Sequence, residues 1–179
     1  METIENKENI PQLLMRRENL DDLPALCIPE GFILRTYQDG DGSKWEDLTE
    51  STLGFRSDFK KDIMNNPFFM KERIFFIYKD DELAATATAW CTNDEPETGY
   101  VHMVGADSKF KGKGLGYQIS LATLHRMKEE NKKSVILHTD DFRLPAIVVY
   151  LRLGFKPVMF HESHELRWQN IYKELGMSQ

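Results

Sequence analysis

Three glycines stand at alternate positions in the stretch FKGKGLGYQ (residues 110–118), with a lysine on either side of the first. The chain has only 11 glycines in 179 residues, and an apolar, helix-like run follows these three at once. Glycine removes side chains where the backbone must come close to another group, and the first N–H groups of a helix attract anions. We therefore expect this loop to hold a phosphate group, with Lys111 and Lys113 adding positive charge.

Two common phosphate-binding motifs do not fit these residues. A Walker A site needs a glycine five residues before its Gly-Lys pair and a Ser or Thr after it, but Asp107 and Gly114 stand at those places. A dinucleotide-binding GxGxxG motif would need a glycine at 117 or 119, where the chain has Tyr117 and Ile119. A strand, a glycine-rich turn and a helix remain, and they suit a pyrophosphate. The alternative is a solvated lysine-glycine turn.

The longer stretch VGADSKFKGKGLGYQISLATLHRM resembles the acyl-CoA-binding motif of the GNAT superfamily of N-acetyltransferases, Q/R-x-x-G-x-G/A after a strand. Lys111 takes the Q/R place and keeps a cation there, although it lacks the fork of donors that arginine has. Gly114 and Gly116 are the two glycines of the motif. The resemblance implies a CoA-binding loop formed by the residues Lys111, Gly112, Lys113, Gly114, Leu115 and Gly116.

A second stretch, RLPAIVVYLRLGF (143–155), resembles the second signature of that family, N-x-x-A-x-x-x-Y-x-x-x-G-F, through Ala146, Tyr150, Gly154 and Phe155. Two motifs in the right order are more specific than either alone. The resemblance covers about residues 31–160. It implies a central mixed sheet with a V-shaped opening between its parallel strands.

The resemblance also implies the remaining cofactor contacts. A bulge in one central strand of the family leaves backbone N–H groups free to bind the pantetheine arm and to polarise the thioester carbonyl, and this main-chain role falls on Val104, Gly105 and Ala106. Arg143 stands where the family usually has an asparagine that contacts CoA. An arginine there either reaches a phosphate of the cofactor or lies in solvent.

Acyl transfer to an amine needs a base and an acid. A lysine-like amine with a pKa of ~10.4 is protonated at neutral pH, and the departing thiolate is best protonated by a nearby acid. Tyr150 resembles the tyrosine to which the family assigns the acid role, and a buried structural tyrosine is the alternative. His138 and His102, on two predicted central strands, are candidates for the base. Each is otherwise an ordinary strand histidine.

The pattern of apolar residues predicts the elements that position these groups. Residues 1–30 are expected to form a short helix or lead-in segment, and residues 31–179 a single acetyltransferase domain. The spacing predicts an α/β fold of mixed α+β type, with a central mixed sheet of about six to seven strands flanked by helices. Strands are expected at 31–37, 73–78, 83–91, 100–106, 134–140 and 155–160, and helices at 45–55, 58–65, 115–131, 145–153 and 163–175.

Composition narrows the classes of partner and location. A net charge of −6 argues against nucleic acid as the main partner and favours a cationic substrate. The polar first residues and the lack of a long apolar run predict a cytoplasmic protein that does not bind membranes. Cys27 and Cys91 lack metal or disulfide spacing. His161 and His164 are three residues apart without a third ligand, so we expect a solvated helix start and no metal.

We therefore expect an N-acetyltransferase that moves an acetyl group from acetyl-CoA directly to a primary amine of a small molecule or a peptide. A non-catalytic acyl-CoA-binding regulatory module is the alternative, since it would keep the glycine loop without needing Tyr150. The identity of the acceptor and the oligomeric state, a homodimer included, stay open.

Overall fold

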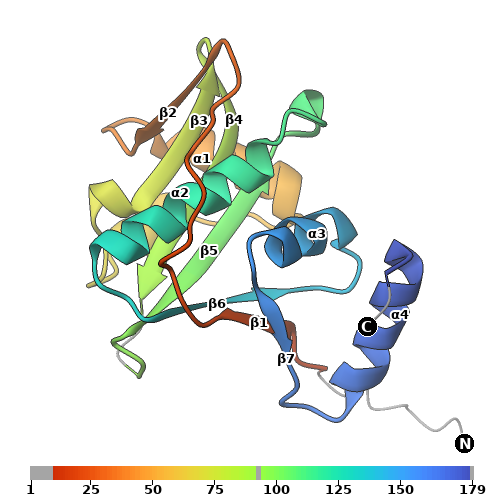
Figure 1. The fold of residues 1–179 in the computed structure, drawn as a ribbon. Coiled ribbons are helices and arrows are strands. Elements are labelled where there is room, and N and C mark those ends of the chain that lie inside the picture. Colours follow the sequence, from red (N-terminus) through yellow and green to blue (C-terminus); the bar gives the residue numbers. More distant parts are fainter. Residues whose placement is uncertain (1–9, 92–93, 178–179) are drawn as a thin grey trace, which may run out of the picture.

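The computed structural model describes residues 10–91 and 94–177. They form a mixed α/β fold around one open sheet of seven strands in the order β2-β3-β4-β5-β6-β1-β7. The predicted class and strand number are confirmed (Figure 1). The strands are β1 (Leu13–Arg17), β2 (Phe32–Thr36), β3 (Ile74–Lys79), β4 (Glu82–Cys91), β5 (Thr98–Ala106), β6 (Ser134–Thr139) and β7 (Lys156–Val158).

Helices cover both faces of the sheet. α1 packs on β4 and β5, and α2 packs on the other face of β3, β4 and β5 (Figure 1). α3 packs against α2, and α4 covers the strands beyond β5. The helices are α1 (Gly42–Leu53), the π-helical turn η1 (Phe59–Met64), the 3-10 turns η2 (Lys71–Arg73) and η3 (Ser108–Phe110), α2 (Leu115–Glu129), α3 (Leu144–Arg152) and α4 (Ser163–Leu175). No helix in residues 10–91 and 94–177 is long and apolar enough to cross a membrane.

Each predicted strand and helix from residue 31 onward is present, with shifts of a few residues at the ends. β3, β4 and β5 pair in antiparallel order. The strand expected at 155–160 is shorter, because β7 covers only three residues. Helix α3 ends with Leu153 as its cap, and the next residue, Gly154, takes the left-handed conformation (φ 83°) that follows many helix ends.

A short helix or a lead-in segment is expected at residues 1–30, of which residues 1–9 lie outside the described part of the chain; residues 10–30 contain a strand and no helix. Residues Leu13–Arg17 form β1, which lies between β6 and β7 and pairs antiparallel with both. Leu13 and Met15 are fully buried in the core beside α4. From β1 the chain runs across α2 to reach β2 at the far edge of the sheet (Figure 1). The N-terminal segment therefore completes the half of the sheet that contains β6.

Candidate active site

The two parallel strands of the sheet separate after a short shared stretch. β5 and β6 pair only from Thr98↔Ser134 to Tyr100↔Ile136, although β5 continues to Ala106 and β6 to Thr139. Figure 1 shows the two strands diverging from this shared end. Beyond Tyr100, the edge of β5 that faces β6 pairs with no strand of the described residues, so its backbone polar groups are available to a ligand. The V-shaped opening expected between the central strands is present.

A β-bulge lies in β5 at the start of this opening. The pairing with β4 passes from Thr86↔Gly105 to Thr88↔His102, so that two residues of β5 face Ala87. One of them, Met103, has a φ of 52°, which an L-residue rarely adopts. The expected bulge is therefore present at Met103 and Val104, and it overlaps the start of Val104, Gly105 and Ala106, the residues expected to offer main-chain N–H groups.

The glycine loop connects η3 to α2 and leaves open space around its backbone. Gly112 and Gly114 have φ angles of 82° and 73°. A Cβ built on Gly112, Gly114 or Gly116 would meet no atom within 4 Å. Gly114 is the N-cap of α2. Because glycine has no side chain, it cannot cap the first N–H groups of the helix. This arrangement fits an anion.

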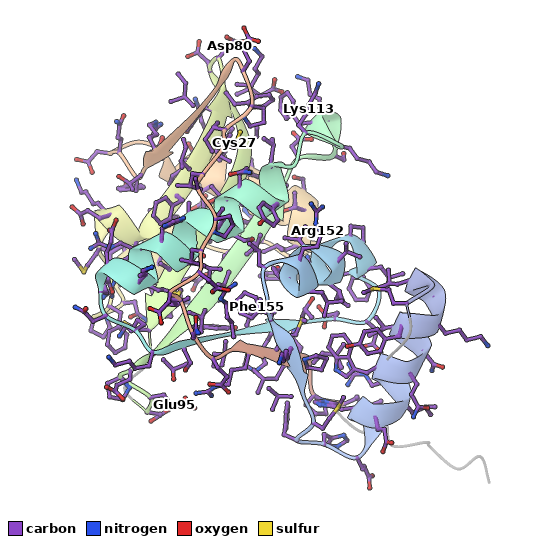
Figure 2. All side chains as sticks on the ribbon, viewed as in Figure 1. Cys27, Asp80, Glu95, Lys113, Arg152 and Phe155 are labelled. Carbon is purple, nitrogen blue, oxygen red and sulfur yellow. The ribbon has the colours of Figure 1, made fainter. Side chains whose placement is uncertain are left out.

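The side chains of the loop divide between solvent and core. Lys111 and Lys113 are exposed, and Lys113 points away from the molecule in Figure 2. Leu115 is 3% exposed and packs with Ile119 of α2 and Ala85 of β4. Leu115 is therefore restricted to a main-chain contact with a ligand, whereas the two lysines are able to add charge.

Tyr150 lies on α3 with its ring buried against Phe155, the two ring centroids being 6.1 Å apart. Burial raises the pKa of Tyr150 to about 12, the nearby Arg143 acts in the opposite direction, and the nearby Tyr100 raises it further. The hydroxyl therefore keeps its proton at neutral pH, which is the state that a general acid needs.

His102 and His138 lie on neighbouring strands with Tyr100 between their rings. Tyr100 is 5.3 Å from His102 and 5.6 Å from His138 between ring centroids. The Tyr100 hydroxyl is 3.3 Å from His138 Nδ1. Burial and the nearby His138 lower the pKa of His102 to about 4, and burial lowers the pKa of His138. The structure thus brings both predicted histidines to the opening.

Tyr100 is missing from the residues predicted to form the site. It stands two positions before His102 in a strand, which places both side chains on the same face. That alternation was the available signal. Its contact with His138 depends on the register of β5 with β6, which the sequence does not reveal.

Arg143 precedes α3 and points toward α1. Its Nη2 donates to the main-chain oxygen of Thr52 over 3.1 Å. A Cβ on Gly105 would lie 2.5 Å from Thr52 Oγ1, so Thr52 packs against the end of β5. Arg143 therefore lies beside the bulged strand.

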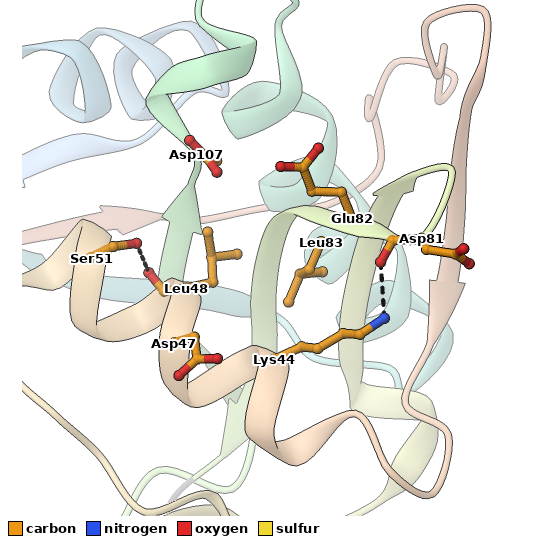
Figure 3. Close-up of a pocket in the computed structure, with 8 residues that line it drawn as sticks. All are labelled: Lys44, Asp47, Leu48, Ser51, Asp81, Glu82, Leu83 and Asp107. Atoms are coloured by element: carbon orange, nitrogen blue, oxygen red, sulfur yellow. Dashed lines mark hydrogen bonds between the residues drawn. The ribbon is translucent and has the colours of Figure 1, made fainter.

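The hollow shown in Figure 3 is a different place. It measures about 300 Å³ and lies between α1 and the turn that joins β3 to β4. Lys44 Nζ donates to the Asp81 main-chain oxygen there, over 2.9 Å. None of the residues predicted for the site lines it. The negative charge of its carboxylates would repel a phosphate ligand. These carboxylates belong to Asp47, Asp81, Glu82 and Asp107.

The expected solvated helix start at His161 and His164 is wrong for one of the two histidines. His161 is exposed, but His164 is fully buried, with Nδ1 3.3 Å from the Val158 main-chain oxygen. No group of three or more His, Cys, Asp or Glu residues within 10–91 and 94–177 has the arrangement of a metal site. Cys27 is an exposed free thiol and Cys91 a buried one.

The chain is similar in sequence to curated acetyltransferases. The chain is 27% identical over 162 residues to the mycothiol acetyltransferase of Thermomonospora curvata. The matched residues make up 84% of this chain and 54% of that protein. It is 30% identical over 150 residues to the mycothiol acetyltransferase of Nocardia farcinica, covering 75% and 48%. The chain therefore spans about half the length of these curated relatives.

Solved structures share the fold. The GCN5-related N-acetyltransferase from Sphaerobacter thermophilus has a TM-score of 0.67 at 21% identity, covering 83% of this chain and 50% of that one. The ribosomal-protein-S18-alanine N-acetyltransferase from Escherichia coli has a TM-score of 0.59 at 16% identity, covering 72% and 79%. The family model for the acetyltransferase (GNAT) family matches residues 37–155, which include the bulge, the glycine loop and Tyr150. This chain belongs to the acetyltransferase (GNAT) family.

Proposed function

We propose that this protein transfers an acetyl group from acetyl-CoA directly to a primary amine. The observation that carries the proposal is the opening between β5 and β6 with the bulge of β5 beside it, and the proposal puts the protonated Tyr150 at the same opening. The active unit in this proposal is the single domain of residues 31–179, completed by β1. We also propose a cytoplasmic location.

The proposed binding of acetyl-CoA uses the main chain. The N–H groups of Val104, Gly105 and Ala106 would hold the pantetheine arm and stabilise negative charge on the thioester oxygen. The pyrophosphate would lie on the loop of Lys111, Gly112, Lys113, Gly114, Leu115 and Gly116, where the free space around the glycine Cα atoms suits a close approach. Arg143, beside the end of β5, would contribute a further contact to the cofactor.

The proposed chemistry needs one acid and one base. Tyr150 would donate its hydroxyl proton to the departing sulfur, and its raised pKa keeps that proton available. His138 and His102 are the candidates for accepting the proton of the amine. A lysine-type amine carries that proton at neutral pH, so its removal must precede attack.

The acceptor is a small-molecule amine or a peptide amine. Because the relatives are named mycothiol acetyltransferases, the amine substrate of those enzymes is the first compound to test. Lysine derivatives and peptides with a free amino terminus should be tested beside it. The alternative function is a regulatory module that binds acyl-CoA without catalysis. It would explain the glycine loop but gives no role to a protonated tyrosine at the opening.

Two measurements separate these functions. Acetyl-CoA should raise the melting temperature if the site binds it, because a ligand specific for the folded state stabilises that state. Release of free CoA thiol should then depend on the added amine. A melting shift without amine-dependent thiol release would favour the regulatory module, and the absence of a shift at millimolar acetyl-CoA would contradict both functions.

A further inference from the structure

One side-chain contact joins the two central strands at the point where they separate. Tyr100 is the last residue of β5 that pairs with β6, and its partner is Ile136. His138 stands two positions beyond Ile136, on the same face of β6. The 3.3 Å contact between the Tyr100 hydroxyl and His138 Nδ1 therefore lies across the narrow end of the opening.

Tyr100 is more buried than His138, so the pair extends from the interior of the protein to solvent. Tyr100 is half-buried, and its phenol is close enough to Tyr150 to raise the pKa of that residue. His138 is exposed. Tyr100 thus lies near the proposed acid on one side and contacts a solvent-exposed imidazole on the other.

The protonation states of the pair allow the Tyr100 hydroxyl to donate to the imidazole. Burial raises the pKa of Tyr100, so its hydroxyl keeps a proton at neutral pH. Partial burial of its ring lowers the pKa of His138 although the side chain reaches solvent, so the ring is neutral at pH 7 and one nitrogen has a free lone pair. A phenol is the more acidic donor of the two groups. In this arrangement, the Tyr100 hydroxyl donates to Nδ1, which puts the ring proton of His138 on Nε2.

His102 has a different environment. Its ring lies between those of Trp90 and Tyr100, at centroid distances of 5.9 Å and 5.3 Å. With a pKa lowered to about 4, it is a poor acceptor for a proton at neutral pH. In the described part of the chain no side chain is hydrogen-bonded to it. His102 is thus an uncharged residue that borders the site and is unsuited to proton transfer at neutral pH.

We propose that Tyr100 and His138 form a relay that carries the proton of the acceptor ammonium group to solvent. This inference rests on the proposed function. The proton of the ammonium passes to the Tyr100 oxygen while the hydroxyl proton of Tyr100 passes to His138 Nδ1, and the imidazolium releases a proton to water. The freed nitrogen lone pair forms the bond to the thioester carbon. The C–S bond breaks, and its electron pair leaves with the sulfur, which takes the hydroxyl proton of Tyr150. The nitrogen loses its second proton as the amide forms, and that proton restores the Tyr150 hydroxyl.

The relay is tested with Tyr100→Phe, His138→Gln and the double variant. Each single change should lower kcat about 100-fold for the most active amine, the worth of a positioned proton acceptor, and leave the KM for acetyl-CoA unchanged. The double variant should be no slower than the slower single variant, because both changes interrupt one path. Matched controls are Tyr172→Phe and His161→Gln on or beside α4, which should retain normal kcat.

A second acceptor separates a proton path from a structural role. A β-fluorinated analogue of the same amine has a lower pKa and is largely neutral at the assay pH, so it needs no relay. The variants should lose less than about fivefold with this analogue. Equal losses with both amines, or retention of kcat within threefold, would overturn the relay.

Nitrogen NMR of the histidines gives a measurement that needs no acceptor. His138 Nδ1 should show the shift of an unprotonated, hydrogen-bonded nitrogen, and Tyr100→Phe should move that shift. A proton on Nδ1 in the parent protein would overturn the relay. Binding of acetyl-CoA without acetylation of any amine would overturn the proposed function and the relay with it, whereas an active parent with active variants would overturn the relay alone.

Discussion

Arg143 donates a hydrogen bond to the main-chain oxygen of Thr52, which joins the start of α3 to the last turn of α1. The two helices belong to opposite sides of the opening, since α1 packs on β5 and α3 follows β6. Thr52 itself packs against Gly105 of β5. The guanidinium is therefore held at the site where the pantetheine arm is proposed to bind.

Arg143→Met should weaken acetyl-CoA binding at least about tenfold. The change keeps most of the apolar stem and removes the charge, and a hydrogen bond from a charged group contributes about 1.5–3 kcal/mol. Calorimetric titration with acetyl-CoA measures the effect, with Arg152→Met, an exposed arginine of α3, as the control. A dissociation constant within twofold of the parent, together with a lower melting temperature, would limit Arg143 to joining the two helices.

Gly114→Leu should abolish the melting shift caused by acetyl-CoA. The side chain would enter the open space where the phosphate is proposed to lie, and the positive φ adds about 1 kcal/mol of backbone strain. Gly176→Leu is a matched control, because Gly176 ends α4 with a φ of 65° and equally open surroundings. Both variants should lose similar stability, and only Gly114→Leu should lose the ligand response. An unchanged shift would make the loop a simple turn.

Met15→Ala should lower the free energy of unfolding by about 2–5 kcal/mol. Met15 is fully buried in β1, and removing a large core side chain costs transfer energy and leaves a cavity. Urea unfolding measures the loss, and Ile10→Ala, at a side chain 59% exposed, should change stability by less than about 0.5 kcal/mol. Equal effects of the two changes would mean that β1 is not part of the core.

The strand β1 also shows what the sequence could not reveal. Leu13, Leu14 and Met15 precede two arginines, a pattern without the alternation of a half-buried strand. Arg17 is nearly buried because its guanidinium bonds the main-chain oxygen of Leu153, a residue far along the chain. A partner so far along the chain cannot be predicted from the residues around Arg17. By contrast, α4 was predicted with its observed bounds, because its apolar spacing is local.

The site divides in the same way. The glycine loop and Tyr150 were predicted because their motifs depend on spacing along the chain. The pair of Tyr100 and His138 comes from two strands, and only the register of β5 with β6 brings the residues together. The direction of Arg143 toward Thr52 likewise depends on how α1 and α3 pack.

Stability should fall with decreasing pH between about 6.5 and 4 because of His102. Its pKa is about 4 in the folded protein and about 6.5 when unfolded, so the unfolded chain binds the proton first as the pH falls. The loss is on the order of 3 kcal/mol and is complete only below pH 4. Urea midpoints across this range measure it. His102→Gln should flatten the dependence, whereas the exposed His161→Gln should leave it unchanged; equal slopes in all three proteins would contradict the buried, neutral state of His102.

Tyr150→Phe should lower kcat by about 10²–10⁴-fold, the usual effect of removing a positioned general acid. The ring and its contact with Phe155 remain, so the melting temperature and acetyl-CoA affinity should change little. Steady-state release of CoA thiol with the most active amine, beside a melting curve, measures both effects, and Tyr172→Phe on α4 is the control. A structural tyrosine predicts the reverse pattern, with lower stability and near-normal turnover. A rate within about threefold of the parent would remove Tyr150 from the mechanism, since that margin is far below the general-acid effect.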